Sequence, residues 1–294
     1  MKRPGRYALG AAVAGVPLGL AVLGPFLVGE PTARAASFTP GGGHWLGTDF
    51  VGRDVLDQVL LGGRPVVLVA LAATALAYLV ALPVGLISAL THRRWLEESL
   101  MRPLDVLLAV PSLLMLLLVA AAFPPGAVGL ALLVAFVSVP DAARIVRAAA
   151  AEAGSRPAVE ALRMQGESWW RLAVGYVGRS ILRTLAADAG IRLTGVLYLV
   201  ATAAFLGIGV APDAADWAVM VDRNRTGLFI QPWAVVVPAL LIVALTMGSN
   251  LLVDAAMEER AAGARAPSDR TTGHRVRSEP DPSTPTPPRK GRRP

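Results

Sequence analysis

The sequence predicts an all-α membrane protein with six transmembrane helices and both termini in the cytoplasm. Six apolar stretches without a charged residue are each about long enough to cross a bilayer. About twenty residues, each rising roughly 1.5 Å, match a hydrocarbon core about 30 Å thick. Backbone groups in lipid must be satisfied within their own segment, so each stretch should be a helix. The stretches are residues 7–28, 65–90, 106–123, 124–140, 193–212 and 233–253.

Basic residues give the orientation of these helices. An even number of crossings places both termini in one compartment. The side that holds the termini also holds seven arginines between residues 144 and 183, whereas the opposite side has five arginines offset by seven acidic residues. By the positive-inside rule we expect a multi-pass protein of the cytoplasmic membrane with both termini inside. This topology accounts for the formal net charge of +7, so no nucleic-acid partner is expected.

The sequence divides into three regions. Residues 1–64 hold the first transmembrane helix and an extracytoplasmic segment, and residues 65–254 hold the main membrane domain. Residues 255–294 are rich in Pro, Arg, Ser and Thr, and we expect a disordered, basic cytoplasmic tail that meets lipid head groups at most. The apolar run at residues 7–28 is longer than the roughly 7–15 residues of a cleaved signal peptide, so it is interpreted as a retained anchor.

The connections between the spans are also predictable. Residues 55–60 carry Val and Leu at helical spacing, which indicates a short amphipathic helix on the outer membrane surface. The corner at residues 124–126 predicts a tight antiparallel hairpin between the third and fourth spans, and Pro111 should kink the third. Residues 141–183 form the largest expected inside loop.

The outer segment carries the most distinctive motif, at residues 44–56. It resembles the H-x-L-G-T-D-x-x-G-R-D-V-L signature of the inner-membrane permeases of dipeptide, oligopeptide and nickel ABC importers, and in particular the second, C-type permease of each pair. The matching positions include His44, Leu46, Gly47, Thr48, Asp49, Gly52, Arg53 and Asp54. Two interpretations stay open: Asp49, Arg53 and Asp54 cap and orient the surface helix, or they touch a delivered solute or its binding protein.

Two further stretches, residues 101–113 and 205–220, resemble motifs of the same family. The resemblance extends over residues 3–254. It implies the type I ABC importer permease fold, with residues 65–254 as the ABC transmembrane type-1 permease domain. It also implies a homologous second permease subunit, two ABC ATPase subunits and an extracytoplasmic solute-binding protein, and import of peptides or a similar small solute, such as nickel, by alternating access.

The inside loop resembles the E-A-A-x-x-x-G loop that docks into the ATPase of such importers. Glu160, Ala161 and Gly166 carry the match, and Arg163 and Arg171 lie on the same bend. Pro157 can open a short helix and Gly166 can end it, which gives a protruding elbow. The loop departs from the family in two places. Leu162 replaces the second alanine, and Gly178-Arg179 stands where Leu-Pro usually follows.

More than one interpretation stays open for the remaining candidate residues. Asp188 and Arg192 stand four residues apart, either as a structural helix pair or as the site of an ion-coupled secondary carrier, and a non-transporting scaffold is the third hypothesis. Trp169 and Trp170 suit a membrane–water boundary or an ATPase contact. The chain lacks a G-x-x-x-x-G-K-[ST] loop and cysteine, and His44 stands alone, so we expect no enzyme activity, no cofactor and no metal.

Overall fold

The computed structural model describes residues 3–29, 34–41 and 43–265. The chain divides into two units, residues 1–257 and residues 258–294. The described part of the second unit is the end of a helix that reaches Arg265, so the tail boundary expected at residue 255 falls inside a helix. The rest of the predicted disordered tail, residues 266–294, lies outside the described residues.

The described residues contain helices and no strand, which confirms the all-α prediction. Five helices are long and apolar enough to cross a membrane, and a bent helix pair makes six if it counts as one span. The elements are α1 (Arg3–Leu27), α2 (Val55–Leu90), α3 (Arg94–Leu108), α4 (Ser112–Ala122), α5 (Ala127–Gly154), α6 (Pro157–Met164), the π-helix η1 (Arg171–Gly178), α7 (Arg179–Phe205), α8 (Trp217–Asn224), the 3₁₀ turn η2 (Arg225–Gly227) and α9 (Trp233–Arg265).

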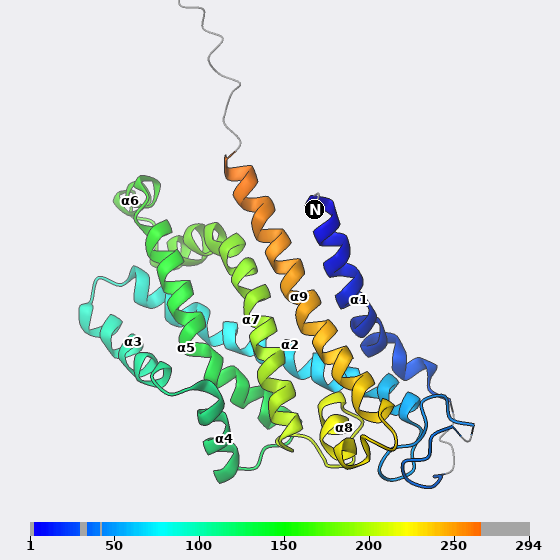
Figure 1. Cartoon of the computed structure of the whole chain (residues 1–294). Helices are drawn as coiled ribbons and strands as arrows, with labels where there is room; N and C mark the ends of the chain where they lie inside the picture. Colours follow the sequence, from blue (N-terminus) through cyan, green and yellow to red (C-terminus); the bar gives the residue numbers. More distant parts are fainter. Residues whose placement is uncertain (1–2, 30–33, 42, 266–294) are drawn as a thin grey trace, which may run out of the picture. The chain divides into compact units, whose positions relative to one another are not determined.

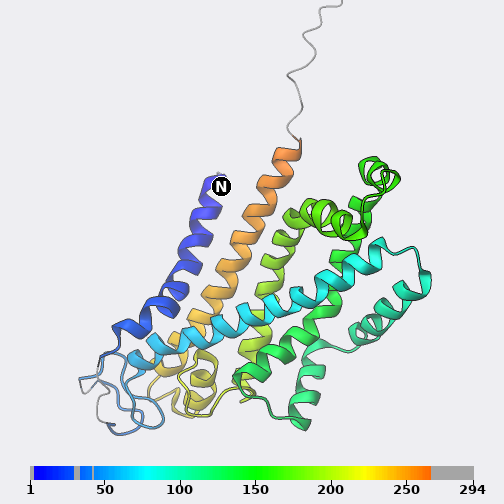
Figure 2. The same ribbon diagram turned by 180° about the vertical axis from the view of Figure 1, so that it is seen from behind.

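Small residues let the long helices approach closely. Helices α2 and α5 form the central packing pair, and a Cβ on Gly85 would lie 2.6 Å from Val146. Helix α1 runs beside α9 in both views of the first unit (Figures 1 and 2), and a Cβ on Gly248 would meet Ala14. Because lipid tails are as apolar as leucine, close packing of small residues is a main source of helix association in a bilayer.

The predicted surface helix at residues 55–60 is wrong as a separate element. These residues form the first turns of α2, which runs unbroken for 36 residues, or about 54 Å. Val55 and Val59 are buried in the main core cluster together with Trp217 from α8. The apolar side predicted to face lipid is therefore covered by protein, and the helix exceeds the roughly 30 Å of hydrocarbon.

The kink predicted at Pro111 is confirmed, but it is so sharp that the predicted third span, residues 106–123, is not a single helix. Helices α3 and α4 meet at 90°, with the break before Ser112. Pro111 lacks the backbone N–H that a continuous helix would need there. Two ion pairs join α3 to α5: Arg144 donates to Asp105 at 2.6 Å, and Arg147 pairs with Glu97.

The predicted ends of the fourth and fifth spans shift toward the inside. Helix α5 continues past Pro140 to Gly154, and α7 already begins at Arg179 and ends at Phe205. The inside loop of residues 141–183 is therefore largely helical, since alanine-rich turns and ion pairs to α3 extend α5 beyond its apolar part. The short connection predicted at residues 124–126 is confirmed: α4 ends at Ala122 and α5 begins at Ala127.

Candidate functional site

The outer motif begins as the N-terminal cap of α2. The Oδ1 atom of Asp54 accepts a hydrogen bond from the backbone N–H of Leu56 at 2.8 Å. Its Oδ2 atom is 2.7 Å from Nδ1 of His44. A capping carboxylate satisfies backbone donors that the first turn of a helix leaves without a partner. His44 thus orients the carboxylate that begins α2, the longest helix among the described residues.

Asp49 organises the turn before this cap. Its side chain is buried, and Oδ1 accepts hydrogen bonds from the backbone N–H groups of Val51 and Arg53 at 2.9 and 2.8 Å. The Arg53 guanidinium donates from Nε to Asp49 Oδ2 at 2.9 Å and from Nη1 to the carbonyl oxygen of Asp213 at 2.7 Å. Arg53 therefore ties the start of α2 to the loop before α8.

Two glycines of the motif lie where no side chain fits. Gly47 has a φ of +69°, and a Cβ there would lie 1.8 Å from Nε2 of Gln231. Gly52 has a φ of +80°, and a Cβ would lie 1.9 Å from the carbonyl oxygen of Ala35. Thr48 is buried beside them and donates from Oγ1 to the Ala36 carbonyl at 2.7 Å. Glycine is required here by both conformation and space.

The motif is joined to α8 and to the start of α9. The backbone N–H of Phe50 donates to Asn224 Oδ1 at 2.9 Å, and the side-chain amide of Gln231 donates to the carbonyl oxygen of Leu46. Leu46 packs against the main core, whereas Trp45 beside it is 92% exposed. The polar groups of the motif are thus used within the protein, and the side chain that points outward is one that the motif leaves variable.

The inner elbow is anchored at its base and exposed at its tip. Val159 of α6 is fully buried in a cluster that joins the inner ends of α2, α5 and α7 with η1, and Leu162 packs against that cluster. The leucine that departs from the family pattern is therefore on the inward side of α6. The exposed residues of the tip include Glu160, Ala161, Arg163 and Gly166, and Met164 between them is 80% exposed.

Gly166 makes the sharp bend of this elbow. Its φ is +78°, and a Cβ there would have open space, so conformation alone favours glycine. The N–H of Glu167 donates to the Leu162 carbonyl at 3.2 Å, which closes the end of α6. Arg171 then pairs with Glu167 at 2.7 Å across one turn. The bend leads directly into η1.

The structure also accounts for the second departure from the family pattern, Gly178-Arg179 in place of Leu-Pro. Gly178 ends η1 and Arg179 begins α7, so the helical path continues without a break. A proline at residue 179 would lack a backbone donor, and the wide π turns place Gly178 near the carbonyl of Ala173. This chain thus has a continuous entry into its fifth span.

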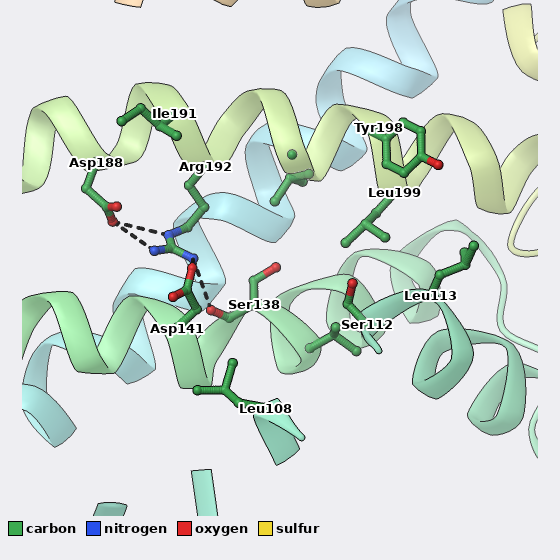
Figure 3. A pocket seen from close by; sticks show the side chains of 13 residues that line it. Leu108, Ser112, Leu113, Ser138, Asp141, Asp188, Ile191, Arg192, Tyr198 and Leu199 are labelled. Atoms are coloured by element: carbon green, nitrogen blue, oxygen red, sulfur yellow. Dashed lines mark hydrogen bonds and ion pairs between the residues drawn. The ribbon is translucent and has the colours of Figure 1, made fainter. Parts of the chain in front are cut away.

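A cavity of about 510 Å³ lies between α4, α5 and α7 (Figure 3). Arg192 lies at one end of it and donates from Nη2 to Asp188 Oδ2 at 3.0 Å and from Nη1 to Asp141 Oδ2 at 3.2 Å. Its side chain is 7% exposed, whereas that of Asp141 is 63% exposed. Leu113, Leu199 and Tyr198 line the other end. The cavity is therefore charged at one end and largely apolar at the other.

Two residues of this cluster were not singled out by the sequence. Tyr78 of α2 donates its hydroxyl hydrogen to Asp188, and its ring lies 5.7 Å from the Arg192 guanidinium carbon. Asp141 was interpreted as the first residue of a loop, although it lies within α5. Its position directly after an uncharged span could have indicated that it lies in a membrane helix. A carboxylate in a membrane helix turns toward protein or water because exposure to lipid is costly.

The structure therefore brings the predicted residues together as two separate groups and a cavity between them. The outer group is a hydrogen-bonded frame, the inner group is an exposed elbow on a shared apolar base, and a charged cavity lies among the helices. Among the residues in the described ranges, no three His, Cys, Asp or Glu side chains gather as metal ligands. A bundle of long apolar helices with such a cavity defines a polytopic membrane permease.

The chain belongs to the family of binding-protein-dependent transport system inner membrane components, whose family model matches residues 81–258. It is 31% identical to the probable D,D-dipeptide transport system permease protein DdpC of Escherichia coli strain K12, over 73% of this chain and 72% of that protein. It is 30% identical to the di/tripeptide transport system permease protein DppC of Pseudomonas aeruginosa strain UCBPP-PA14, over 71% and 69%.

A third relative is named for a different substrate. The chain is 28% identical to the glutathione transport system permease protein GsiD of Pectobacterium atrosepticum, over 73% of this chain and 71% of that protein. The family confirms a multi-pass inner-membrane permease subunit of an ABC importer, with ATP hydrolysis on separate subunits. It favours the importer over the ion-coupled carrier hypothesis for Asp188 and Arg192.

Proposed function

We propose that this chain is the C-type subunit of an ATP-driven importer of small peptides. It pairs with a homologous second permease, receives solute from an extracytoplasmic binding protein and works with two ABC ATPase subunits. The supporting observation is the elbow formed by α6, Gly166 and η1, which exposes a charged tip on a base shared by three membrane helices. The named relatives transport di- and tripeptides, D,D-dipeptides or glutathione, so peptides are favoured over nickel.

The elbow is suited to carry motion from an ATPase to the membrane helices. Its tip offers Glu160 and Arg163 to a partner surface, while Val159 inserts among residues of α5, η1 and α7. A packed base of this kind transmits displacement because interiors are densely packed and resist compression. A push on the tip therefore moves the inner ends of α2, α5 and α7 together. This is the step that alternating access requires.

The cavity between α4, α5 and α7 is proposed as part of the solute path. Asp141 presents an exposed carboxylate, and its neighbour Arg192 is shared with Asp188. The cluster of two acids and one base is net negative, which suits the ammonium group of a peptide, and the leucine-lined end suits an apolar side chain. Charged groups inside the membrane region commonly mark such paths.

The test is to replace Gly166 with valine in the complete transporter. A branched residue at a φ of +78° is strained by about 1–2 kcal/mol or more, so the elbow should change shape. We expect reduced co-purification of the ATPase subunits and loss of solute-stimulated ATP hydrolysis. Gly175→Ala is the matched control, because a Cβ there meets only Arg171 Cγ at 3.8 Å. Normal ATPase binding and stimulation by Gly166→Val would refute the coupling role.

A further inference from the structure

A second cavity, of about 580 Å³, lies between the inner half of α2 and the corner where η1 meets α7. Helix α2 contributes Leu82 and Leu86 to its wall, and the opposite wall includes Trp170 and Val174. Among the lining residues that the structure describes, Arg179 is the one with a charge. The cavity is thus an apolar slot with a single guanidinium beside it.

The slot lies at the depth of the cytoplasmic lipid leaflet. Its residues on α2 extend from 79 to 87, about 12 Å of helix, and α2 ends at Leu90 on the inner side. Trp169 and Trp170 line the slot with ring centroids 4.9 Å apart, and Trp170 is 70% exposed. Indole rings favour the level of the lipid head groups. The apolar slot therefore begins at head-group level and extends toward the bilayer interior.

The charge at the slot determines the kind of ligand that fits. Arg179 is exposed and begins α7, and no acidic side chain is found among the described residues that line the slot. Arg171, earlier on the same segment, is already paired with Glu167. A guanidinium binds phosphate strongly, and basic side chains between membrane helices on the cytoplasmic side recruit anionic head groups.

We propose that this slot binds one anionic phospholipid of the inner leaflet. One acyl chain lies between α2 and η1, against Leu82, Leu86 and Val174, and the lipid phosphate lies at Arg179. Figures 1 and 2 show the stretch between α6 and α7 turning across the inner ends of the helices. The bound lipid braces the corner between η1 and α7, and this role does not depend on the solute that the protein carries.

The experiment uses the complete transporter in phosphatidylcholine vesicles that contain a small fraction of a photoactivatable lipid. The probe is phosphatidylglycerol in one preparation and phosphatidylcholine with identical acyl chains in the other. Labelled peptides are located by mass spectrometry. We expect residues 79–87 and 169–182 to be labelled about fivefold more by the anionic probe, the effect of roughly one basic side chain on binding to anionic lipid.

Three variants separate charge from shape. Arg179→Gln should lower the ratio between the two probes to about one, whereas Arg93→Gln, which removes an exposed charge elsewhere on the inner side, should leave it unchanged. Val174→Trp fills the exposed mouth of the slot and should reduce labelling by both probes, with unchanged assembly on gel filtration. Equal labelling of the wild type by both lipids, an unchanged ratio in Arg179→Gln, or cross-links from the slot to another protein subunit would overturn the proposal.

Discussion

The indole Nε1 of Trp217 donates a hydrogen bond to the carbonyl oxygen of Val59, 2.8 Å away, and joins α8 to the outer turns of α2. Its ring lies against Gly62 and Gly63, where a Cβ would come within 2.8 and 2.4 Å of ring atoms. The contact covers the part of α2 that extends beyond the length of a simple membrane span. It explains why two adjacent glycines are tolerated in this helix.

Gly63→Val should therefore destabilise the outer end of the protein. The added methyl groups would overlap the Trp217 ring, and overpacking of this kind costs about 1–3 kcal/mol. Thermal unfolding of the purified protein should show a lower midpoint. Gly19→Ala is the matched control, because a Cβ at Gly19 meets nothing within 4 Å. A Gly63→Val protein as stable as the control would show that the Trp217 ring moves aside freely.

Stability should depend on pH through Asp216. Burial raises the pKa of this carboxyl from 3.8 to about 6, even though the N–H groups of Ala218 and Val219 donate to it. The folded protein thus holds the proton more tightly than the unfolded chain. The stabilisation of the folded state by this proton is complete below about pH 4. It is lost as the pH rises toward 6, which lowers the free energy of unfolding by about 3 kcal/mol.

Asp216→Asn keeps a capping oxygen but cannot ionise. The difference in unfolding midpoint between this variant and the wild type should grow in the variant's favour from pH 4 to 6 and then level off. Asp213→Asn, at an exposed position nearby, should show no such trend. A constant difference between Asp216→Asn and the wild type across this range would mean that Asp216 does not titrate there.

Removing Asp49 should open the outer turn. Asp49→Ala leaves the Arg53 guanidinium and two backbone N–H groups without their acceptor, which should cost about 3 kcal/mol. Limited proteolysis of intact vesicles should then cut the outer segment faster. Asp222→Ala breaks ion pairs at the surface, worth about 0–1 kcal/mol, and should leave the cleavage rate near that of the wild type.

Tyr78→Phe should weaken the link between α2 and α7. It removes the hydroxyl that donates to Asp188, and a hydrogen bond to a charged group contributes about 1.5–3 kcal/mol. Tyr198→Phe is the comparison, since Tyr198 lines the same cavity and is 61% exposed. We expect a lower unfolding midpoint for Tyr78→Phe alone. Equal midpoints for the two variants would show that Asp188 is held by Arg192 without the tyrosine.

The order and approximate positions of the membrane helices could be predicted from hydropathy. Several boundaries could not, nor could the number of spans, which is five or six according to how the bent α3–α4 pair is counted. The charges that ended the predicted fourth span are satisfied by partners on another helix, as Arg144 is by Asp105. Such pairs are invisible in a window of hydropathy because they join residues far apart in the chain. The same holds for Val55 and Val59, whose apolar pattern fits a lipid surface as well as a protein one until Trp217 is placed beside them.

The candidate residues likewise divide into those whose role depends on local geometry and those whose role depends on contacts between distant helices. The capping role of Asp54 and the bend at Gly166 depend on local geometry, and a single segment of sequence predicts both. The pairing of Asp188 with Tyr78 and of Arg192 with Asp141 depends on how three helices cross. The sequence offered the i, i+4 pair alone, because the crossing partners lie 110 and 51 residues away.

The outer motif has its polar atoms bonded inward, while Trp45 and Phe229 stand 92% and 99% exposed on the same side. The side chains that hold the motif in shape are therefore different from those that it exposes to the outside. In a permease built in this way, the residues exposed on the outer face can change while the hydrogen-bonded turn beneath them keeps its shape. One framework can then serve solutes of differing chemistry.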